Sequence, residues 1–461
     1  MVSRRAALTV LAVALLLFAG CTAPSATPDV DDSSEVEAGD VPDEDGESDD
    51  EQTDADNDDE QTDADNDDAS GEPTDATDDG PDDANEDVEP SDYPDLDLNE
   101  NVVWNDVTEL IGSDAPQPNL FVDEMPPGTS DAFEPQQSDF QKALNATETA
   151  SGGNGTSGLA TPGNVYVFPD GPDEEVEQVL VHEYTHTIQY AEGMFASWLR
   201  SPPETTDEEL VQTALIEGGA VYVADEYTDE QLDSVPLQSE QMQATYEAAP
   251  VGDRLLFAPY YFGAKYIHDD IDSAEELPEV YSSPPLTTSE LLDPDREPPA
   301  TDLTVDVENT ESDWSVTRTD RQGELYTRIV LDTELSNDEA VEAAAGWSDD
   351  ELLAFTDAGQ DGFAWTTQWA SSDDADEFEA AFESKLDQRT DEWVDRTTVE
   401  RVDDRTVAVV IGPERFRAAV DISASGDGVD LVVTEPTSAA ETTMTEPSLA
   451  GPTVSGTRVA A

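Results

Sequence analysis

The sequence predicts an α+β protein, because strand-like and helical segments are mixed along the chain. A β-branched and aromatic run at 165–168 is typical of a strand, and it ends at Asp170-Gly171-Pro172, where a helical pattern begins. A second helical pattern covers 206–227. Later in the chain, strand-like runs at 326–331, 351–355, 362–369 and 406–411 are interspersed with helical candidates at 337–345, 375–387 and 413–420.

Composition divides the chain into two folded units and their flanks. We expect a larger unit at 99–290 and a smaller α+β unit at 300–435, joined by a Pro- and acid-rich segment. Residues 22–98 hold about 34 acidic residues and no lysine or arginine, and the nonapeptide DEQTDADND occurs twice in succession. Such a segment buries too little apolar surface to fold, so 22–98 and the Thr/Ser/Pro-rich tail at 436–461 are predicted to be disordered.

The charge of the chain is strongly negative throughout. The 461 residues include 111 acidic and 18 basic side chains, a net charge of −93, and about 77 of the acids lie in 99–461. This charge repels nucleic acid and anionic lipid surfaces, so we expect no nucleic-acid partner. Only three basic residues are lysine, and the composition resembles that of proteins from halophilic archaea, which stay hydrated in concentrated salt. The charge therefore indicates habitat rather than substrate.

The first 21 residues have the features of an export signal. Arg4 and Arg5 precede an uncharged apolar run from Ala6 to Gly20, which is shorter than the ~20 residues that a transmembrane helix needs. The run ends at Cys21, the only cysteine, in a Phe-Ala-Gly-Cys sequence that resembles a lipobox. We expect twin-arginine export and a lipid on Cys21 that anchors the protein to the outer face of the cell membrane. A plain signal peptide is the alternative.

Two N-glycosylation sequons begin at Asn145 and Asn154. Both lie in a Gly/Ser/Thr-rich segment at 145–163, which we expect to be a loop. On an exported chain the two asparagines are candidate glycan acceptors, although such tripeptides also arise by chance.

The helix that follows Pro172 carries the metal-ligand spacing HExxH, as His182-Glu183-Tyr-Thr-His186. Residues four apart share a helix face, so both imidazoles can bind one ion, and zinc is the ion that this spacing favours. Glu183 then lies next to the metal and can take a proton from a bound water. The chain has three histidines, and two of them are in this motif. The strand at 165–168, beside the metal helix, is a candidate for holding an extended substrate backbone.

A third zinc ligand is expected from the helix at 206–227. Glu217 falls within an apolar stripe, where a carboxylate is costly to bury unless a metal or another partner accompanies it. Gly218 and Gly219 remove side chains next to Glu217, which we expect to permit close approach to the histidine helix. Asp225 and Glu226 remain alternative ligands.

The motifs His182-Glu-Tyr-Thr-His186-Thr-Ile-Gln189 and Ala214-Leu-Ile-Glu217-Gly-Gly-Ala220 resemble those of the gluzincin metallopeptidases. They are similar above all to a set of haloarchaeal and bacterial surface lipoproteins with the patterns HExTHxxQ and ALxEGxA. Asp293 stands where members of that set usually carry histidine. The resemblance implies a zincin-like fold for the larger unit. The segment from Gly346 to Phe378 resembles a C-terminal module of the same family, for which we expect a packing or substrate-docking role.

Taken together, these features predict a zinc-dependent peptidase acting on peptide or protein substrates. His182, His186 and Glu217 would hold Zn²⁺, and Glu183 would act as general base. A tyrosine, Tyr260 or Tyr261, would stabilise the oxyanion, with His268 as a further option on the same predicted helix, 258–270. For these three a core or surface position is the simpler interpretation, and His268 beside two aspartates is expected to be solvated. The alternative function is a surface-binding or envelope-organising protein with a non-catalytic metal.

Overall fold

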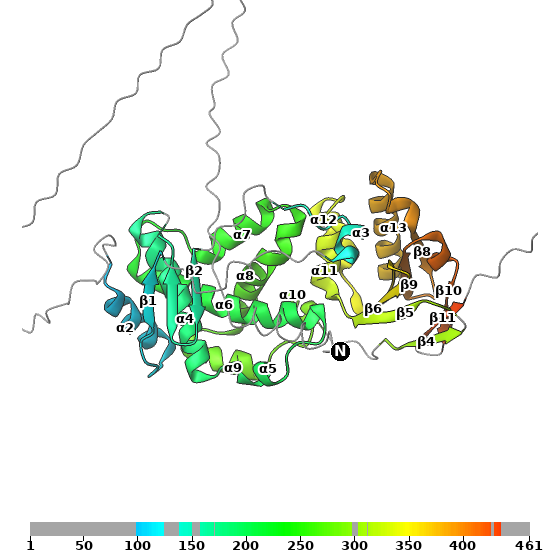
Figure 1. The fold of residues 1–461 in the computed structure, drawn as a ribbon. Coiled ribbons are helices and arrows are strands. Elements are labelled where there is room, and N and C mark those ends of the chain that lie inside the picture. The colour runs from blue at the N-terminus through cyan, green and yellow to red at the C-terminus, as the bar shows by residue number, and fades with distance from the viewer. Residues whose placement is uncertain are drawn as a thin grey trace, which may run out of the picture. The chain divides into compact units, whose positions relative to one another are not determined.

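The computed structural model describes residues 98–123, 138–149, 157–169, 171–296, 303–310, 312–425 and 428–434 (Figure 1). Helices and strands are mixed, which confirms the α+β prediction. None of the helices in these ranges is both long and apolar enough to span a membrane. The predicted lipid site Cys21, the sequon at Asn154, and most of the predicted linker and all of the predicted tail lie outside the described residues.

The first part of the described chain is a helical layer beside a small mixed sheet. Its strands have the order β1-β3-β2, with β1 parallel and β2 antiparallel to the central β3. These strands are β1 (Asn119–Val122), β2 (Gly158–Thr161) and β3 (Asn164–Val167). The helices are α2 (Glu100–Ile111), α4 (Asp173–Glu192), α5 (Ala196–Arg200), α6 (Thr206–Gln231), α7 (Gln238–Ala248), α8 (Val251–Asp270), α9 (Leu277–Ser282) and α10 (Thr288–Leu292), with a short 3₁₀ turn, η1 (Ala274–Glu276).

The metal helix α4 and the long helices α6 and α8 form the centre of this part. Helix α6 packs against α4 on one side and α8 on the other, as Figure 1 shows. Helices α6 and α8 meet through their backbones: a Cβ on Gly218 would overlap Gly263, and one on Gly263 would overlap the carbonyl of Ala214. The expectation that Gly218 faces the histidine helix is therefore wrong, because it faces α8. The contact at Gly218 and Gly263 therefore sets how closely α6 packs against α8.

The second part of the described chain is a three-layered α+β unit. A five-stranded antiparallel sheet in the order β5-β6-β7-β9-β8 has helices on one face and the small sheet β10-β11-β4 on the other. Both faces of β7 are covered, so most of its residues are buried. The strands are β4 (Val305–Thr310), β5 (Ser315–Asp320), β6 (Trp347–Asp357), β7 (Gln360–Trp369), β8 (Thr397–Arg401), β9 (Thr406–Ile411), β10 (Val420–Ser425) and β11 (Gly428–Thr434).

The helical layer of this unit consists of α11 (Gly323–Leu331), α12 (Asn337–Ala344), α13 (Ser372–Gln388) and α3 (Asp139–Ala143), which comes from the N-terminal side of the metal helix. Figure 1 shows α3, in cyan, beside α11 and α12. The end of α3 is bound by two basic side chains, one in α13 and one directly after it. Lys385 donates from Nζ to the carbonyl of Leu144 at 2.9 Å, and Arg389, just beyond the helix, donates to that of Ala143 at 2.8 Å. Burial lowers the pKa of Lys385 to about 7.

Helix α11 belongs to both hydrophobic cores. Leu325 and Ile329 lie in the core around the metal helix, whereas Tyr326 and Val330 lie in the core of the second unit. The prediction of a strand at 326–331 is wrong. Their β-branched and aromatic character favours a strand, but these residues fill two different faces of a helix. The helical spacing of apolar residues cannot be recognised in this segment, because both faces of the helix are buried and apolar residues occur on each.

Two further expectations need correction. The predicted loop at 145–163 contains strand β2, whose Gly158 pairs with Val167 of β3. Its composition resembles a loop, and only the pairing makes it a strand. The helix expected at 413–420 shrinks to α14 (Glu414–Arg417), because β10 begins at Val420. The helices α12 and α13 and the strands β7 and β9 confirm their predictions closely.

The start of α6 is bound both by α10 and by the segment that precedes α11. Asp207 accepts from the backbone N–H of Thr288 at 2.9 Å and pairs with Arg321 at 3.2 Å. The backbone N–H of Thr206 donates to Asp320 at 2.8 Å. Gly323 adopts a φ of 86°, and a side chain there would run into Asp207. These contacts connect the helix that carries Glu217 to the second unit.

We expect Gly263→Ala to destabilise the protein by about 3 kcal/mol, the upper end of the cost of overpacking, because the clash is with backbone rather than with a movable side chain. Lys265→Ala, on the exposed side of the same helix, is the control and should change stability by less than about 0.5 kcal/mol. Urea unfolding in concentrated salt measures both. Equal stabilities would contradict the backbone contact between α6 and α8.

Candidate metal centre

Helix α4 places both motif histidines on its buried face. The helix begins after Pro172, has Asp173, Glu174 and Glu175 in its first turn, and ends at Gly193 with a φ of 66°. Acidic residues stabilise the N-terminus of a helix and a left-handed glycine ends it, so the local sequence sets both limits. His182 and His186 are one turn apart and fully buried.

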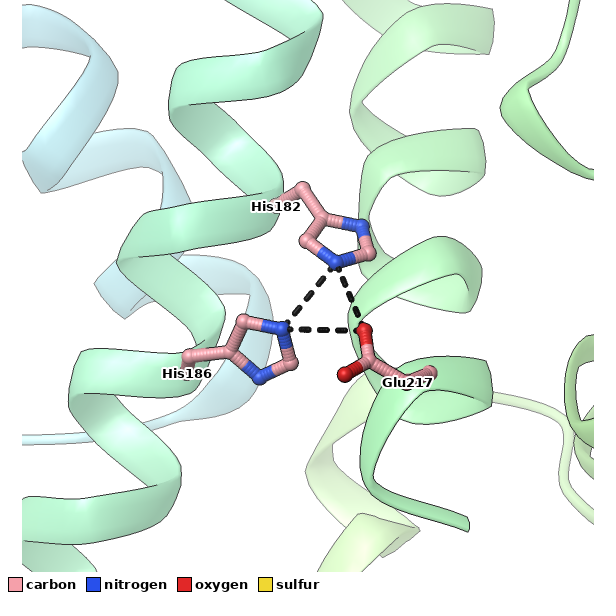
Figure 2. A group of neighbouring side chains, drawn as sticks. All are labelled: His182, His186 and Glu217. Atoms are coloured by element: carbon pink, nitrogen blue, oxygen red, sulfur yellow. Dashed lines mark hydrogen bonds and ion pairs between the residues drawn. The ribbon is translucent and has the colours of Figure 1, made fainter. Parts of the chain in front are cut away.

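The third group of the cluster is Glu217 of α6 (Figure 2). The Nε2 atoms of His182 and His186 are 3.0 Å apart, and each lies 3.3 Å from Oε2 of Glu217. Figure 2 shows the three side chains pointing toward one another from two helices. This is a group of three metal-ligating side chains within the described part of the chain, and it contains the residues that the sequence predicted.

Hydrogen bonds on the far side of each ring set its tautomer. Nδ1 of His186 lies 2.9 Å from Oε1 of Gln189, and Nδ1 of His182 lies 2.8 Å from Oε1 of Gln238. An amide oxygen only accepts, so each Nδ1 carries the proton and donates it. Both Nε2 atoms therefore present a lone pair to Glu217 and to each other.

Three acceptors that face one another repel unless a cation or an extra proton lies among them. Two imidazole nitrogens and a carboxylate oxygen are the donor set of many zinc sites. Ligands of a tetrahedral zinc ion are about 3.3 Å apart when each lies ~2.0 Å from the metal. The observed separations of 3.0–3.3 Å match this spacing, so the residues fit a zinc ion.

The electrostatics of the cluster favour a cation. Burial alone raises the pKa of a carboxyl group, but the two imidazoles outweigh it and lower the pKa of Glu217 to about 2. Burial lowers the pKa of His182. The same burial acts on His186, but the charges of Glu217 and Glu183 overcome it and raise its pKa. A metal ion at this position would compete with protons for the same ligand atoms.

Glu183 lies against the edge strand β2. Its side chain is fully buried, and a Cβ on Gly158 of β2 would lie 2.7 Å from both Cγ and Oε1 of Glu183. The glycine thus leaves the space that the carboxylate occupies. The strand expected to hold substrate, 165–168, is instead the central β3, whose two edges are both paired, so β2 is the edge strand beside Glu183.

The two tyrosines predicted as oxyanion donors lie in different surroundings. The ring of Tyr260 stacks against that of His182, with 6.0 Å between centroids. Tyr261 instead contacts Tyr246 and Phe262. The structure therefore places Tyr260 at the cluster and Tyr261 away from it.

His268 and the alternative ligands lie outside the cluster. Nε2 of His268 pairs at 2.9 Å with Asp225, which is buried and also accepts from the backbone N–H of Ser239. His268 is exposed, as expected, but it also has a partner that the sequence did not indicate, because Asp225 approaches it from α6. Glu226 is half-buried. Neither Asp225 nor Glu226 belongs to the group around His182.

The sequon at Asn145 is exposed, but its side chain is already engaged. Asn145 adopts a φ of 60°, and its Nδ2, the atom that a glycan would modify, donates to Glu334 at 2.7 Å. Glycosylation at this site stays a prediction.

Sequence reasoning missed the groups that orient the imidazoles. Gln189 is part of the HExTHxxQ pattern, which does not indicate its role, and no motif includes Gln238 or Tyr281. Nε2 of Gln189 donates to the carbonyl of Ile216 at 3.0 Å and to the hydroxyl of Tyr281 at 2.8 Å. Helix spacing offered a signal for Gln189, which lies one turn beyond His186. Nothing local points to residues brought in by α7 and α9.

We expect Glu217→Ala to lower zinc affinity by more than the about 10- to 100-fold that loss of an outer hydrogen-bond partner causes, because a direct ligand is lost. Glu230→Ala, at the exposed end of the same helix, should bind zinc as the wild type does. Metal analysis and chelator competition on the purified chain measure both effects. Retention of zinc by Glu217→Ala would contradict the assigned ligand set.

Comparison with known proteins gives one match. A family model described as Domain of unknown function (DUF8575) matches residues 313–444. The matched range covers most of the second unit and does not include the residues of the metal centre. No curated protein and no solved structure matches the chain. The chemistry of the site therefore has to be argued from its own geometry.

Proposed function

We propose that the protein is a zinc-dependent metallopeptidase of the gluzincin type, with a zincin-like fold around α4 and α6. The observation that carries this proposal is the buried convergence of His182, His186 and Glu217, with Glu183 directly beside the first histidine. Three protein ligands leave a fourth position for water, as in catalytic zinc sites, whereas structural zinc sites generally have four protein ligands.

Each residue has a distinct role in this reaction. A bound zinc ion supplies Lewis-acid polarisation of a water molecule and of the scissile carbonyl. Glu183 accepts the proton of the attacking water and returns it to the leaving amine. Tyr260, next to His182, donates a hydrogen bond to the oxygen that becomes negative as the carbonyl is attacked.

The substrate class follows from the strand beside Glu183. In this proposal an extended peptide aligns with the edge of β2, so that main-chain hydrogen bonds bring its carbonyl to the site. Gly158 has no side chain there, which allows the backbone of β2 to approach Glu183 closely. A peptide or protein substrate is therefore favoured over a small molecule.

A second candidate is a non-catalytic metal protein that binds or organises components at the cell surface. The observation that favours it is burial: both histidines and Glu183 have no exposed surface, and Glu217 has 5 %. A purely structural site, however, does not need a carboxylate next to its first ligand.

The location that we propose rests on residues 1–21 alone. A lipid on Cys21 would anchor the chain outside the cell, and the acidic segment at 22–98 would extend the folded part away from the membrane by self-repulsion.

We expect Glu183→Gln to lower kcat by about 10²- to 10⁴-fold while zinc content is retained, because the general base is removed and the ligands stay. Peptide hydrolysis is measured in concentrated salt, with and without a chelator. Glu175→Gln, in the exposed first turn of α4, is the control and should keep full activity. A wild-type protein that holds zinc but hydrolyses no peptide would support the non-catalytic candidate.

We expect Tyr260→Phe to lower kcat by about 10²- to 10³-fold with little change in KM, because an oxyanion donor acts mainly in the transition state. Tyr261→Phe, one residue along and facing Tyr246, is the matched control. If both variants keep wild-type kcat, Tyr260 is a packing residue beside His182.

A further inference from the structure

Both imidazoles of the metal centre are held by side-chain amides rather than by carboxylates. Oε1 of Gln189 lies 2.9 Å from Nδ1 of His186, and Oε1 of Gln238 lies 2.8 Å from Nδ1 of His182. All four residues are buried. Because the chain has 111 acidic residues, a carboxylate would be the more expected partner of each imidazole than a neutral amide.

The orientation of Gln189 is set independently of the histidine. Its Nε2 donates to the carbonyl of Ile216 at 3.0 Å, and a carbonyl only accepts, so the amide oxygen has to face His186. Nε2 also donates to the hydroxyl of Tyr281 at 2.8 Å. A Cβ on Gly219 would collide with that hydroxyl and lie 3.1 Å from Nε2 of Gln189. Gly219, two residues after Glu217, thus leaves room for the hydrogen bond between Gln189 and Tyr281.

Gln238 reaches His182 from the first turn of α7. The backbone N–H of the next residue, Ser239, donates to the buried Asp225 of α6 at 3.1 Å. One turn later, Nε2 of Gln241 donates to Oε1 of Gln178, on α4, at 2.8 Å. The first turn of α7 is therefore attached to both ligand-bearing helices, which fixes the position from which Gln238 acts.

We propose that Gln189 and Gln238 are positioning residues of the metal centre: each fixes its imidazole as the Nδ1-protonated tautomer, so that both Nε2 lone pairs are directed at the same point before a metal ion binds. The inference rests on the proposed metal centre but not on its catalytic activity. A preformed site avoids the cost of ordering two rings when the ion arrives.

The first test replaces each amide by methionine, which keeps the length of the side chain and removes the acceptor. Gln189→Met and Gln238→Met should each lower zinc affinity by about 10- to 100-fold. Gln243→Met is the matched control, because Gln243 lies on the same helix as Gln238 but is exposed, and its Nε2 donates to Glu247 of that helix at 2.8 Å. It should stay within about twofold of wild type. Affinity is measured by chelator competition on the full chain, in concentrated salt.

A second variant separates the acceptor from packing. Gln238→Glu keeps an acceptor oxygen toward Nδ1 of His182, so it should bind zinc at least as tightly as wild type, since a carboxylate raises the basicity of the ring. The absorption spectrum of the Co²⁺-substituted protein should change in Gln189→Met and Gln238→Met and remain close to wild type in Gln243→Met.

The outcomes distinguish this inference from the proposed function. Zinc affinity of Gln189→Met and Gln238→Met equal to wild type, or an affinity of Gln238→Glu as low as that of Gln238→Met, overturns the positioning role. A wild-type chain that binds no zinc overturns the metal centre itself. Zinc binding with the expected losses but without peptide hydrolysis supports the positioning role and contradicts only the peptidase.

Discussion

The approach of three hydrogen-bond acceptors in a buried site is the interaction on which the rest of the structure depends. Nε2 of His182, Nε2 of His186 and Oε2 of Glu217 lie 3.0–3.3 Å apart. A buried carboxylate without a partner is costly, and acceptors at this distance repel one another unless a positive charge lies among them. The surrounding helices are arranged so that this otherwise unfavourable contact is maintained.

Two adjacent glycines of α6 maintain it through contacts with different neighbours. Gly218 allows the backbone of α6 to touch that of α8 at Gly263, which sets the depth of the helix. Gly219 leaves room for the hydroxyl of Tyr281 and the amide of Gln189, which orients His186. A side chain at either position would move Glu217 relative to the imidazoles, so helix packing and ligand geometry are parts of one arrangement.

The second unit supports the candidate metal centre, and none of its described residues belongs to the group of His182, His186 and Glu217. Helix α11 contributes buried side chains to both hydrophobic cores. Asp207, in the first turn of α6, contacts Thr288 and Arg321. Helix α3, from the N-terminal side of α4, packs into the second unit and is bound there by Lys385. The two units are thus connected at several points that are distant in sequence. The family match, which lies within 313–444, covers this supporting part.

The sequence by itself determined the α+β class, the HExxH face of α4 and the choice of Glu217, because helical periodicity and the cost of a buried carboxylate are local properties. It was wrong where both faces of an element are buried, as at 326–331, and where pairing alone makes a strand, as in β2. Only the tertiary structure decided that Gly218 faces α8, that Asp225 pairs with His268 and that Gln238 orients His182. Each of these contacts joins separate helices, and no spacing along one helix encodes which residue another helix brings to it.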